Sequence, residues 1–307
     1  MPTRPFAKLA NQPYVLLTLT MLFWSGNFIL GRAVNAEVPP VGLAFWRWTG
    51  GSLIIIGFAW PHLRRDWPVI RRAWKLITLL AILGITLFNT LVYTGLHATT
   101  AINALLLQST MPVVIVLMSF LLFRERVTPA QVGGIVLSLA GVLTIIAKGS
   151  LTLLLSLSLN SGDLLIFIAV VGYAAYSVLL RKRPAMHPLS FLAVTFIVGD
   201  LILSPFYVWE NLAGNVMQFN RVTLLAVAYV SVFPSILAYL CFNRGVELAG
   251  ANVAGLFFHL MPLFGSIMAI LFLGERFQTF HAFGILFILG GILLATRPRL
   301  LGRSQRR

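Results

Sequence analysis

The sequence has 307 residues, of which 59% are hydrophobic and only 10% are charged, and its mean hydropathy is +0.91. A soluble protein covers its surface with about 25% charged residues, so this composition excludes a soluble enzyme, a secreted disulfide scaffold, a disordered chain and a fibrous protein. The formal net charge is +15. Because the basic residues fall in the gaps between apolar runs, this charge indicates cationic loops beside a membrane and no nucleic-acid partner.

Ten apolar runs are each long enough to cross the hydrocarbon core, which takes about 20 helical residues. The predicted helices cover residues 14–35, 40–60, 74–96, 99–123, 129–147, 162–182, 188–210, 221–246, 250–273 and 279–296. Pro39-Pro40 is predicted to begin the second helix and Pro61 to end it. The fifth helix is predicted to begin with a capping box at Thr128-Pro129-Ala130-Gln131. The runs are too long and continuous for a β-barrel, so the fold class is an all-α integral membrane protein.

The basic residues predict how these helices are oriented. If both termini are cytoplasmic, 18 lysines and arginines lie on the inner side and 4 on the outer side, as the positive-inside rule requires. The four outer residues are Arg32, Lys148, Arg221 and Arg276. One arginine, Arg47, falls within a span.

The sequence contains an internal repeat at an offset of 150 residues. Residues 93–146 aligned without gaps on 243–296 share 15 identities in 54 positions. The recurring features are Met111-Pro112 with Met261-Pro262, Glu125-Arg126 with Glu275-Arg276, and Gly134 and Gly141 with Gly284 and Gly291. Upstream, at an offset of 149, Trp24 matches Tyr173 and Arg32 matches Arg181. The first span therefore belongs to the repeated unit and is not a cleavable signal peptide.

The number of helices in the repeat determines its orientation. Five helices per copy is an odd number, so the second copy enters the membrane inverted with respect to the first. We therefore expect ten transmembrane helices as two inverted five-helix repeats, residues 1–148 and 149–307. This architecture is typical of secondary transporters, which place their site at the interface between the repeats.

The second half of each repeat has a recognisable pattern of Met-Pro, an apolar run, Glu-Arg and a glycine-spaced helix. With this pattern and its ten spans, the chain resembles the EamA family of the drug/metabolite transporter superfamily. The stretches that resemble the family's most recurrent segment are Leu122-Phe123-Arg124-Glu125-Arg126-Val127-Thr128-Pro129 and Leu273-Gly274-Glu275-Arg276. Arg124 stands where the family usually has glycine. Within the family, the chain looks most like bacterial amino acid exporters, including aromatic amino acid exporters. The resemblance implies an exporter of small amphiphilic metabolites in the bacterial inner membrane.

Residues that are polar or aromatic in both repeats are candidates for a substrate path, because polar groups inside a membrane are costly. Trp24 and Asn27 share a helix face and recur as Tyr173 and Tyr176. Asn89 and Tyr93 recur, exchanged in type, as Tyr239 and Asn243. Two stripes complete the set: Ala104, Gln108 and Met111 on the fourth helix, and Ala254, Phe258 and Met261, with His259 beside them, on the ninth. The predicted substrate-binding residues are Trp24, Asn27, Asn89, Tyr93, Gln108, Met111, Tyr173, Tyr176, Tyr239, Asn243, Phe258 and His259.

These residues predict a nearly uncharged cavity that suits a zwitterion with a variable side chain. Aromatic faces attract an ammonium group, amides hydrogen-bond a carboxylate, and Met accepts side chains of different shape. Each residue has a structural alternative, since aromatic residues and amides also pack helices together. His259 is more typical of a hydrogen-bonded interior histidine than of a proton carrier.

Four further residues are assigned gating or structural roles: Arg47, Asp200, Pro112 and Pro262. Arg47 and Asp200 lie on the second and seventh helices, which we expect to be peripheral to the path. Pro112 and Pro262 are expected inside their helices, as hinges or as fixed kinks. Glycines on the fifth and tenth helices predict close helix packing or a dimer face.

Other functions are less consistent with the sequence. A membrane-embedded enzyme is disfavoured because the chain has neither an H-E-x-x-H metal motif nor a phosphate-binding loop. A proton-coupled exporter of hydrophobic cations needs a buried carboxylate, and only Asp200 qualifies. We therefore predict a transporter with no cofactor and no metal. Its partners are amino acid substrates and the lipid bilayer, and it is a monomer or homodimer.

Overall fold

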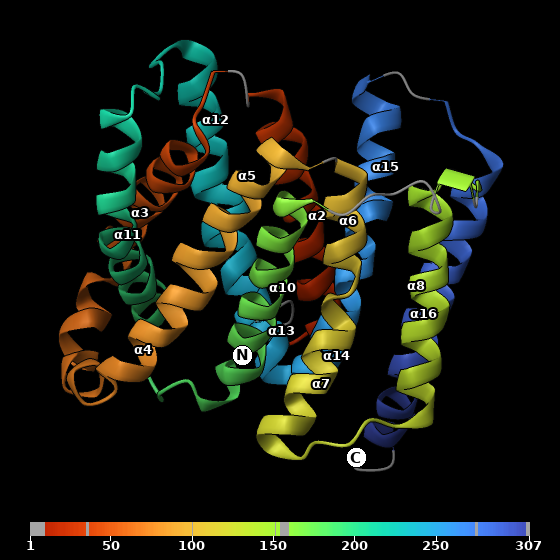
Figure 1. Ribbon diagram of the computed structural model, residues 1–307. Coiled ribbons are helices and arrows are strands. Elements are labelled where there is room, and N and C mark those ends of the chain that lie inside the picture. The colour runs from red at the N-terminus through yellow and green to blue at the C-terminus, as the bar shows by residue number, and fades with distance from the viewer. Residues whose placement is uncertain are drawn as a thin grey trace, which may run out of the picture.

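The computed structural model describes residues 10–34, 37–99, 101–150, 152–153, 160–273 and 276–304. Helices make up nearly all of this part of the chain (Figure 1). In the first repeat they are α2 (Pro13–Ala33), α3 (Pro40–Arg72), α4 (Trp74–Ala81), η1 (Ile82–Leu87), α5 (Phe88–Ala98), α6 (Ala101–Ser109), α7 (Met111–Phe123) and α8 (Pro129–Ile146). In the second repeat they are α10 (Ser161–Leu179), η2 (Leu180–Lys182), α11 (Pro188–Leu212), α12 (Arg221–Ser231), η3 (Val232–Leu237), α13 (Ala238–Ala249), α14 (Ala251–Leu256), η4 (Phe257–His259), α15 (Leu260–Leu273) and α16 (Thr279–Ser304).

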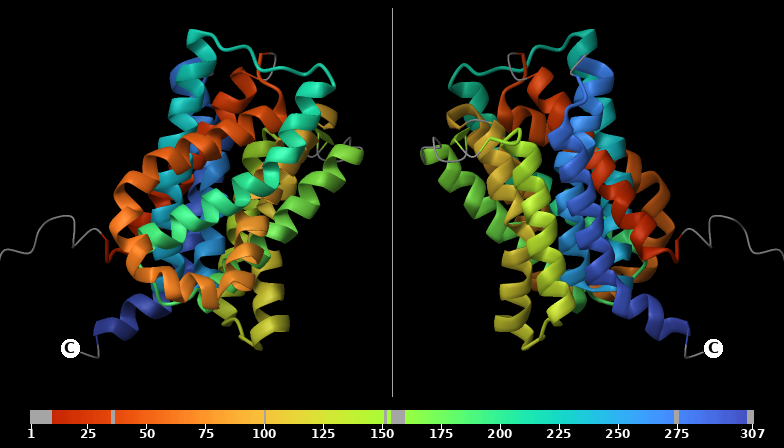
Figure 2. Two further views of the ribbon diagram at one scale, coloured as in Figure 1. Left: turned by 90° about the vertical axis from the view of Figure 1, so that its left-hand side faces the viewer. Right: turned by 90° about the vertical axis from the view of Figure 1, so that its right-hand side faces the viewer.

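The described helices confirm the predicted all-α membrane fold. Among the described residues, nine helical stretches are long and apolar enough to cross a membrane, and α2, with 21 residues, agrees with the remaining predicted span, the first. The start of α2 and the end of α16 lie on the same side of the bundle (Figure 2), as an even number of crossings requires. We call this side the terminal face. Gly274 and Glu275, part of the second Glu-Arg motif, lie outside the described residues.

The contact between α8 and α16 shows that the two repeats are inverted. A Cβ atom added to Gly134 would lie 2.5 Å from the Gly291 carbonyl oxygen, and one added to Gly141 would lie 2.7 Å from that of Gly284. Gly284 and Gly291 are the repeat equivalents of Gly134 and Gly141, so the contact is reciprocal, as a two-fold axis demands. The pairing also runs antiparallel. Since α8 and α16 are the fifth helices of their repeats, one repeat is upside down with respect to the other.

The other helices pair according to the same two-fold relation. The second helix, α3, packs on the seventh, α11; the first, α2, packs on α13 of the eighth; and α5 of the third packs on the sixth, α10. Figure 1 shows α3 and α11 at one side of the bundle, α8 and α16 at the other, and α2, α5, α10 and α13 between them. Each helix of the central group therefore faces a helix from the opposite repeat.

The glycines of the fifth and tenth helices are used within the chain. The α8 and α16 helices are side by side in Figure 1, and their backbones approach where the glycines lie. From the sequence, these glycines could pack helices within one chain or form a dimer face. The contact between α8 and α16 serves the first of these roles. The predicted start of the fifth helix is also confirmed: the Thr128 hydroxyl accepts from the Gln131 N–H at 3.2 Å, and the Gln131 side chain accepts from the Thr128 N–H at 2.9 Å.

Two expectations about prolines are wrong. Pro61 does not end the second helix, because α3 continues through Pro61 and Pro68 to Arg72. This extension carries five charged side chains, which places it outside the hydrocarbon region, where water can bind the carbonyl groups that proline leaves unpaired. Pro112 does not lie inside a helix. The fourth helix is interrupted at Thr110, and Pro112 lies in the first turn of α7, where a missing N–H costs nothing.

The ninth helix has an irregular turn at the equivalent place. The 3₁₀ segment η4, Phe257–His259, separates α14 from α15. Pro262 lies in the first turn of α15, so the expectation that it lies inside a helix is wrong as well. The third and eighth helices also share an irregularity, because the π-helical segments η1 and η3 are both six residues long and are separated by the repeat offset. Each π turn changes the helical hydrogen bonding and exposes backbone carbonyl groups to other partners.

The close contact between α8 and α16 predicts which glycines tolerate a methyl group. We expect Gly134→Ala to lower the free energy of unfolding by about 1–3 kcal/mol, because the new Cβ meets backbone atoms that cannot yield. Gly57→Ala is the matched control, since a Cβ there meets nothing within 4 Å. Thermal melting of both variants in detergent measures the difference. Equal melting temperatures would contradict the proposed backbone contact.

Candidate functional site

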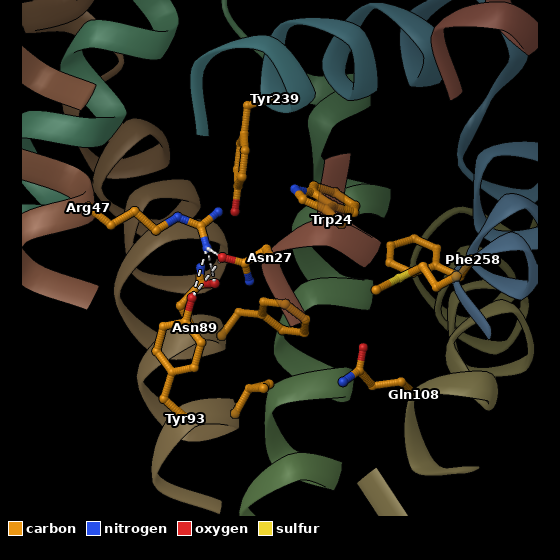
Figure 3. Close-up of a pocket in the computed structure, with 11 residues that line it drawn as sticks. Trp24, Asn27, Arg47, Asn89, Tyr93, Gln108, Tyr239 and Phe258 are labelled. Atoms are coloured by element: carbon orange, nitrogen blue, oxygen red, sulfur yellow. Dashed lines mark hydrogen bonds between the residues drawn. The ribbon is translucent and has the colours of Figure 1, made fainter. Parts of the chain in front are cut away.

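A narrow pocket lies between the two repeats in the middle of the bundle. Its lining residues are Trp24, Asn27, Arg47, Phe88, Asn89, Val92, Tyr93, Gln108, Tyr239, Phe258 and Met261. They come from α2, α3, α5 and α6 of the first repeat and from α13, η4 and α15 of the second. The labelled side chains converge on this space in Figure 3. The cavity measures about 20 Å³, which holds roughly one water molecule, so this conformation is closed around it.

Seven of the twelve residues predicted to bind substrate lie in the wall of this pocket. They are Trp24, Asn27, Asn89, Tyr93, Gln108, Tyr239 and Phe258. Four of them share the helix faces expected from their spacing: Trp24 with Asn27 on α2, and Asn89 with Tyr93 on α5. The pocket takes Met261 from the ninth helix and not its equivalent Met111, which is fully buried elsewhere in the core.

Three other predicted residues lie beside the pocket in a packed cluster. The Tyr173 ring meets Trp24 edge-on with 5.5 Å between ring centroids, and the Tyr176 hydroxyl donates to the Asn243 side chain at 2.8 Å. Arg244, next to Asn243, binds Ala10 and Asn11 before α2, so this cluster extends toward the terminal face. Tyr173, Tyr176 and Asn243 are buried and do not line the pocket in this conformation.

His259 connects three helices through both ring nitrogens. Nε2 lies 2.9 Å from the Ser109 carbonyl oxygen, and Nδ1 lies 2.6 Å from the Ser138 hydroxyl. A carbonyl oxygen can only accept, so Nε2 carries the hydrogen and Nδ1 accepts from Ser138. Ser109 is the repeat equivalent of His259, and therefore this bond lies near the two-fold axis. The ring therefore donates to a backbone carbonyl beside the interruption of the fourth helix.

The prediction of an uncharged cavity is wrong, because Arg47 lies in the pocket wall. Its side chain is 1% exposed and extends from α3 into the centre of the bundle (Figure 3). Nη1 donates to Asn89 Oδ1 at 2.9 Å, to Tyr93 Oη at 3.2 Å and to Asn27 Oδ1 at 3.3 Å. The long arginine side chain spans the distance from α3, so a helix we expected to be peripheral supplies a charge to the pocket.

The same guanidinium also contacts the second repeat. Nε donates to Ser235 Oγ at 2.7 Å, and Nη2 donates to the Pro234 carbonyl oxygen at 3.0 Å. Trp24 Nε1 donates to that carbonyl as well, at 2.9 Å. Pro234 lies in η3, and its repeat equivalent Gly84 in η1 accepts a hydrogen bond from the Tyr239 hydroxyl. Both π-helical segments therefore direct a carbonyl group at a pocket residue of the opposite repeat.

Asp200 is outside the pocket. Its Oδ2 accepts from the Thr49 hydroxyl at 2.7 Å, which ties α11 to α3, and its Oδ1 has no hydrogen-bond partner. The carboxyl group thus belongs to the contact between the second and seventh helices. Among the described residues, no group of three or more His, Cys, Asp or Glu side chains is placed to hold a metal ion.

Sequence reasoning missed three lining residues: Arg47, Phe88 and Val92. A signal for Arg47 was present, since it is the one cation well inside a predicted span, away from the span ends, and has no acidic residue three or four positions away. Phe88 and Val92 flank the polar pair of α5 and follow from its helical face once the pocket is known.

The chain belongs to the EamA-like transporter family, which matches residues 12–147 and 160–297. It is thus a multi-pass membrane protein of a transporter family, with one family unit in each half. A solved crystal structure superposes on it with a TM-score of 0.76, covering 98% of this chain and 99% of the other at 20% sequence identity. This likeness supports the fold.

Curated relatives cover almost the entire chain. An uncharacterized transporter of Archaeoglobus fulgidus is 31% identical over 93% of this chain and 98% of its own length. The uncharacterized transporter YyaM of Bacillus subtilis is 27% identical, over 92% and 93%. The S-adenosylmethionine/S-adenosylhomocysteine transporter of Chlamydia muridarum is 25% identical, over 95% and 93%. These names are those of transporters and not of enzymes.

The geometry of His259 predicts different effects for two substitutions. His259→Leu should lower the free energy of unfolding by about 1–3 kcal/mol, because the Ser109 carbonyl loses its donor inside the membrane. His259→Gln retains an N–H near the Nε2 position, so its free energy of unfolding should fall by less. Thermal melting tests this order. The pH profile of flux in the Gln variant should match that of the unsubstituted protein, and a shifted profile would instead indicate a proton carrier.

Proposed function

We propose that the protein is a secondary transporter that exports amino acids and related small amphiphilic metabolites, with broad specificity that includes aromatic amino acids. The observation that carries this proposal is the pocket of aromatic, amide and thioether side chains at the interface of two inverted repeats. Inverted-repeat transporters place their substrate site at this position. A relative named for S-adenosylmethionine and S-adenosylhomocysteine, both amino acid derivatives, supports the substrate class.

The composition of the pocket fits a broad range of amino acid side chains. Trp24, Phe88, Tyr239 and Phe258 provide ring faces that attract an ammonium group or stack on an aryl side chain. The Met261 thioether adapts to side chains of different shape. Gln108 and Asn89 provide neutral hydrogen-bonding groups. Such contacts are individually weak, which favours turnover over tight binding.

Alternating access requires the pocket to open, since about 20 Å³ holds no amino acid. The irregular turns are placed to allow this. The interruption at Thr110 and the η4 segment occupy equivalent positions in the fourth and ninth helices, and η1 and η3 do so in the third and eighth. All four helices contribute to the pocket wall or lie beside it. We infer that these turns are the hinges about which the halves exchange conformations.

We place the transporter in the bacterial cytoplasmic membrane with both termini inside. The support is the distribution of basic residues over the loops. Arg181 and Lys182 lie in η2, directly after α10. The next residue, Arg183, pairs with Glu247, which also pairs with Arg244, and Arg244 binds Asn11 at the terminal face. The extension of α3, with Arg64, Arg65 and Arg71, is held beside this segment by the bond from the His187 N–H to Asp66. The protein functions as a monomer or homodimer, with amino acids and the lipid bilayer as its partners and no cofactor.

The competing function, proton-coupled export of hydrophobic cations, fits the pocket less well. Arg47 repels a cation in the closed space where the substrate must lie. The carboxyl group that such a mechanism needs is Asp200, and it is bound to Thr49 outside the pocket. The positions of these two charges favour a substrate that carries a negative group.

Flux through the purified protein tests the proposed function. In proteoliposomes we expect saturable counterflow of phenylalanine, methionine and threonine, because the pocket accepts varied side chains. Liposomes without protein are the control. No saturable flux of any of the three would refute the amino acid assignment.

Asp200→Asn separates the two candidate functions. The amide can still accept from Thr49, so we expect flux within about twofold of the unsubstituted protein and no change in its response to an imposed pH gradient. Thr49→Val, which removes this hydrogen bond but keeps the carboxyl group of Asp200, is the matched control. Loss of a pH-gradient response in Asp200→Asn alone would favour the proton-coupled alternative.

A further inference from the structure

The most unusual group in the membrane interior is the Arg47 guanidinium. It is a fully buried cation, and none of the ion pairs between described residues includes it. Its hydrogen-bond acceptors are all neutral: two amide oxygens, two hydroxyl groups and one backbone carbonyl. A charge in this setting is costly unless a partner charge or a polar network offsets it. The neutral oxygens orient their dipoles toward the cation but bring no counter-charge.

The hydrogen bonds of Arg47 are distributed unevenly. A guanidinium has five N–H groups, one on Nε and two on each terminal nitrogen. Three acceptors compete for the two hydrogens of Nη1, whereas Nη2 has the Pro234 carbonyl as its one hydrogen-bond acceptor. The edge formed by the two terminal nitrogens is the part of the fork that binds a carboxylate through two parallel hydrogen bonds.

A second feature of the pocket also indicates a polar ligand. Gln108 is 5% exposed, and both its amide nitrogen and its amide oxygen lack a hydrogen-bond partner. In Figure 3, Gln108 lies at the side of the pocket opposite the guanidinium, and its amide is directed into the space between Arg47 and Phe258. A buried amide with no partner is costly. Hydrogen bonds to a ligand in the pocket would remove that cost.

We propose that Arg47 is the residue that binds the carboxylate of the transported substrate, so that a carboxylate is the group every good substrate must carry. This inference rests on the proposed function and narrows it. Arg47 supplies the positive charge, Gln108 offers amide groups at the other side, and the aromatic rings between them contact the variable part. The substrate carboxylate is then the counter-charge that the buried guanidinium lacks in this conformation.

The inference also explains the neutral acceptors. In the closed pocket, Asn27, Asn89 and Tyr93 accept hydrogen bonds from the guanidinium. These bonds offset part of the free energy that burying the charge costs the empty protein. When the pocket opens, a carboxylate replaces these oxygens with stronger, charge-assisted hydrogen bonds. Arg47 contacts both repeats, through Asn27 and Asn89 on one side and Pro234 and Ser235 on the other. Exchange of its acceptors therefore changes the contacts between the halves that must move.

Three probes that share a phenyl ring test the inference: L-phenylalanine, 3-phenylpropionate and 2-phenylethylamine. The second lacks the ammonium group and the third lacks the carboxylate. By calorimetric titration of the purified protein, we expect phenylethylamine to bind about tenfold more weakly than the other two, or worse. In proteoliposomes, 3-phenylpropionate should compete with phenylalanine flux, whereas phenylethylamine should not.

Substitutions of Arg47 test whether this residue causes the preference for a carboxylate. Arg47→Gln should weaken the binding of phenylalanine and 3-phenylpropionate about tenfold or more. The binding of phenylethylamine should be unchanged or tighter. Arg47→Lys keeps the charge without the fork and should be intermediate. Arg126→Gln makes the same chemical change at an exposed position on the terminal face and should have no effect. If Arg47→Gln does not fold, the competition experiment on the unsubstituted protein still decides.

The outcomes separate this inference from the proposed function. If phenylethylamine binds as tightly as phenylalanine, or Arg47→Gln binds both carboxylates normally, the inference is wrong and amino acid transport remains. If 3-phenylpropionate binds through Arg47 but no amino acid is transported, the inference holds and the amino acid assignment fails. If none of the three probes binds, both fail.

Discussion

The structure depends on one constraint: a backbone carbonyl freed inside a membrane must find a donor within the protein. Within the described residues, the membrane helices deviate from regular α-helical geometry at η1, at Thr110, at η3 and at η4. At or beside the first three, a side chain of the opposite repeat donates to a backbone carbonyl. Tyr239 binds Gly84, His259 binds Ser109, and Trp24 and Arg47 bind Pro234. Each half therefore supplies donors to the irregular backbone of the other.

This exchange of donors explains why the pocket lies where it does. The freed carbonyls and their donors are gathered at the two-fold interface, so the polar groups of the membrane interior are concentrated there too. The regular helices α8 and α16 pack tightly through glycine and hold the scaffold. The glycine contact at one side and the irregular turns at the centre are the structural basis of the hinge motion that we propose.

We propose that the buried charge of Arg47 gives this pocket its selectivity. Aromatic and amide groups alone would accept neutral, zwitterionic or cationic solutes. Arg47 disfavours cations and favours a negative group, and its long side chain links α3 to both halves of the central bundle. Asp200 of α11 is bound to Thr49 on the far side of α3. Its carboxyl group is therefore away from the Arg47 guanidinium and does not serve as a counter-ion.

The sequence alone determined the membrane class, the ten spans, the inverted repeat and seven of the pocket residues. These follow from composition, helical periodicity and the 150-residue offset, which report which face a side chain occupies and which residue is its equivalent. Only the tertiary structure decided that Arg47 enters the pocket, that Tyr176 and Asn243 pack beside it, and that Thr110 interrupts a helix that reads as continuous. Periodicity does not report how far a long side chain reaches or which groups of another helix surround it, and those neighbours decide what a buried charge can bind.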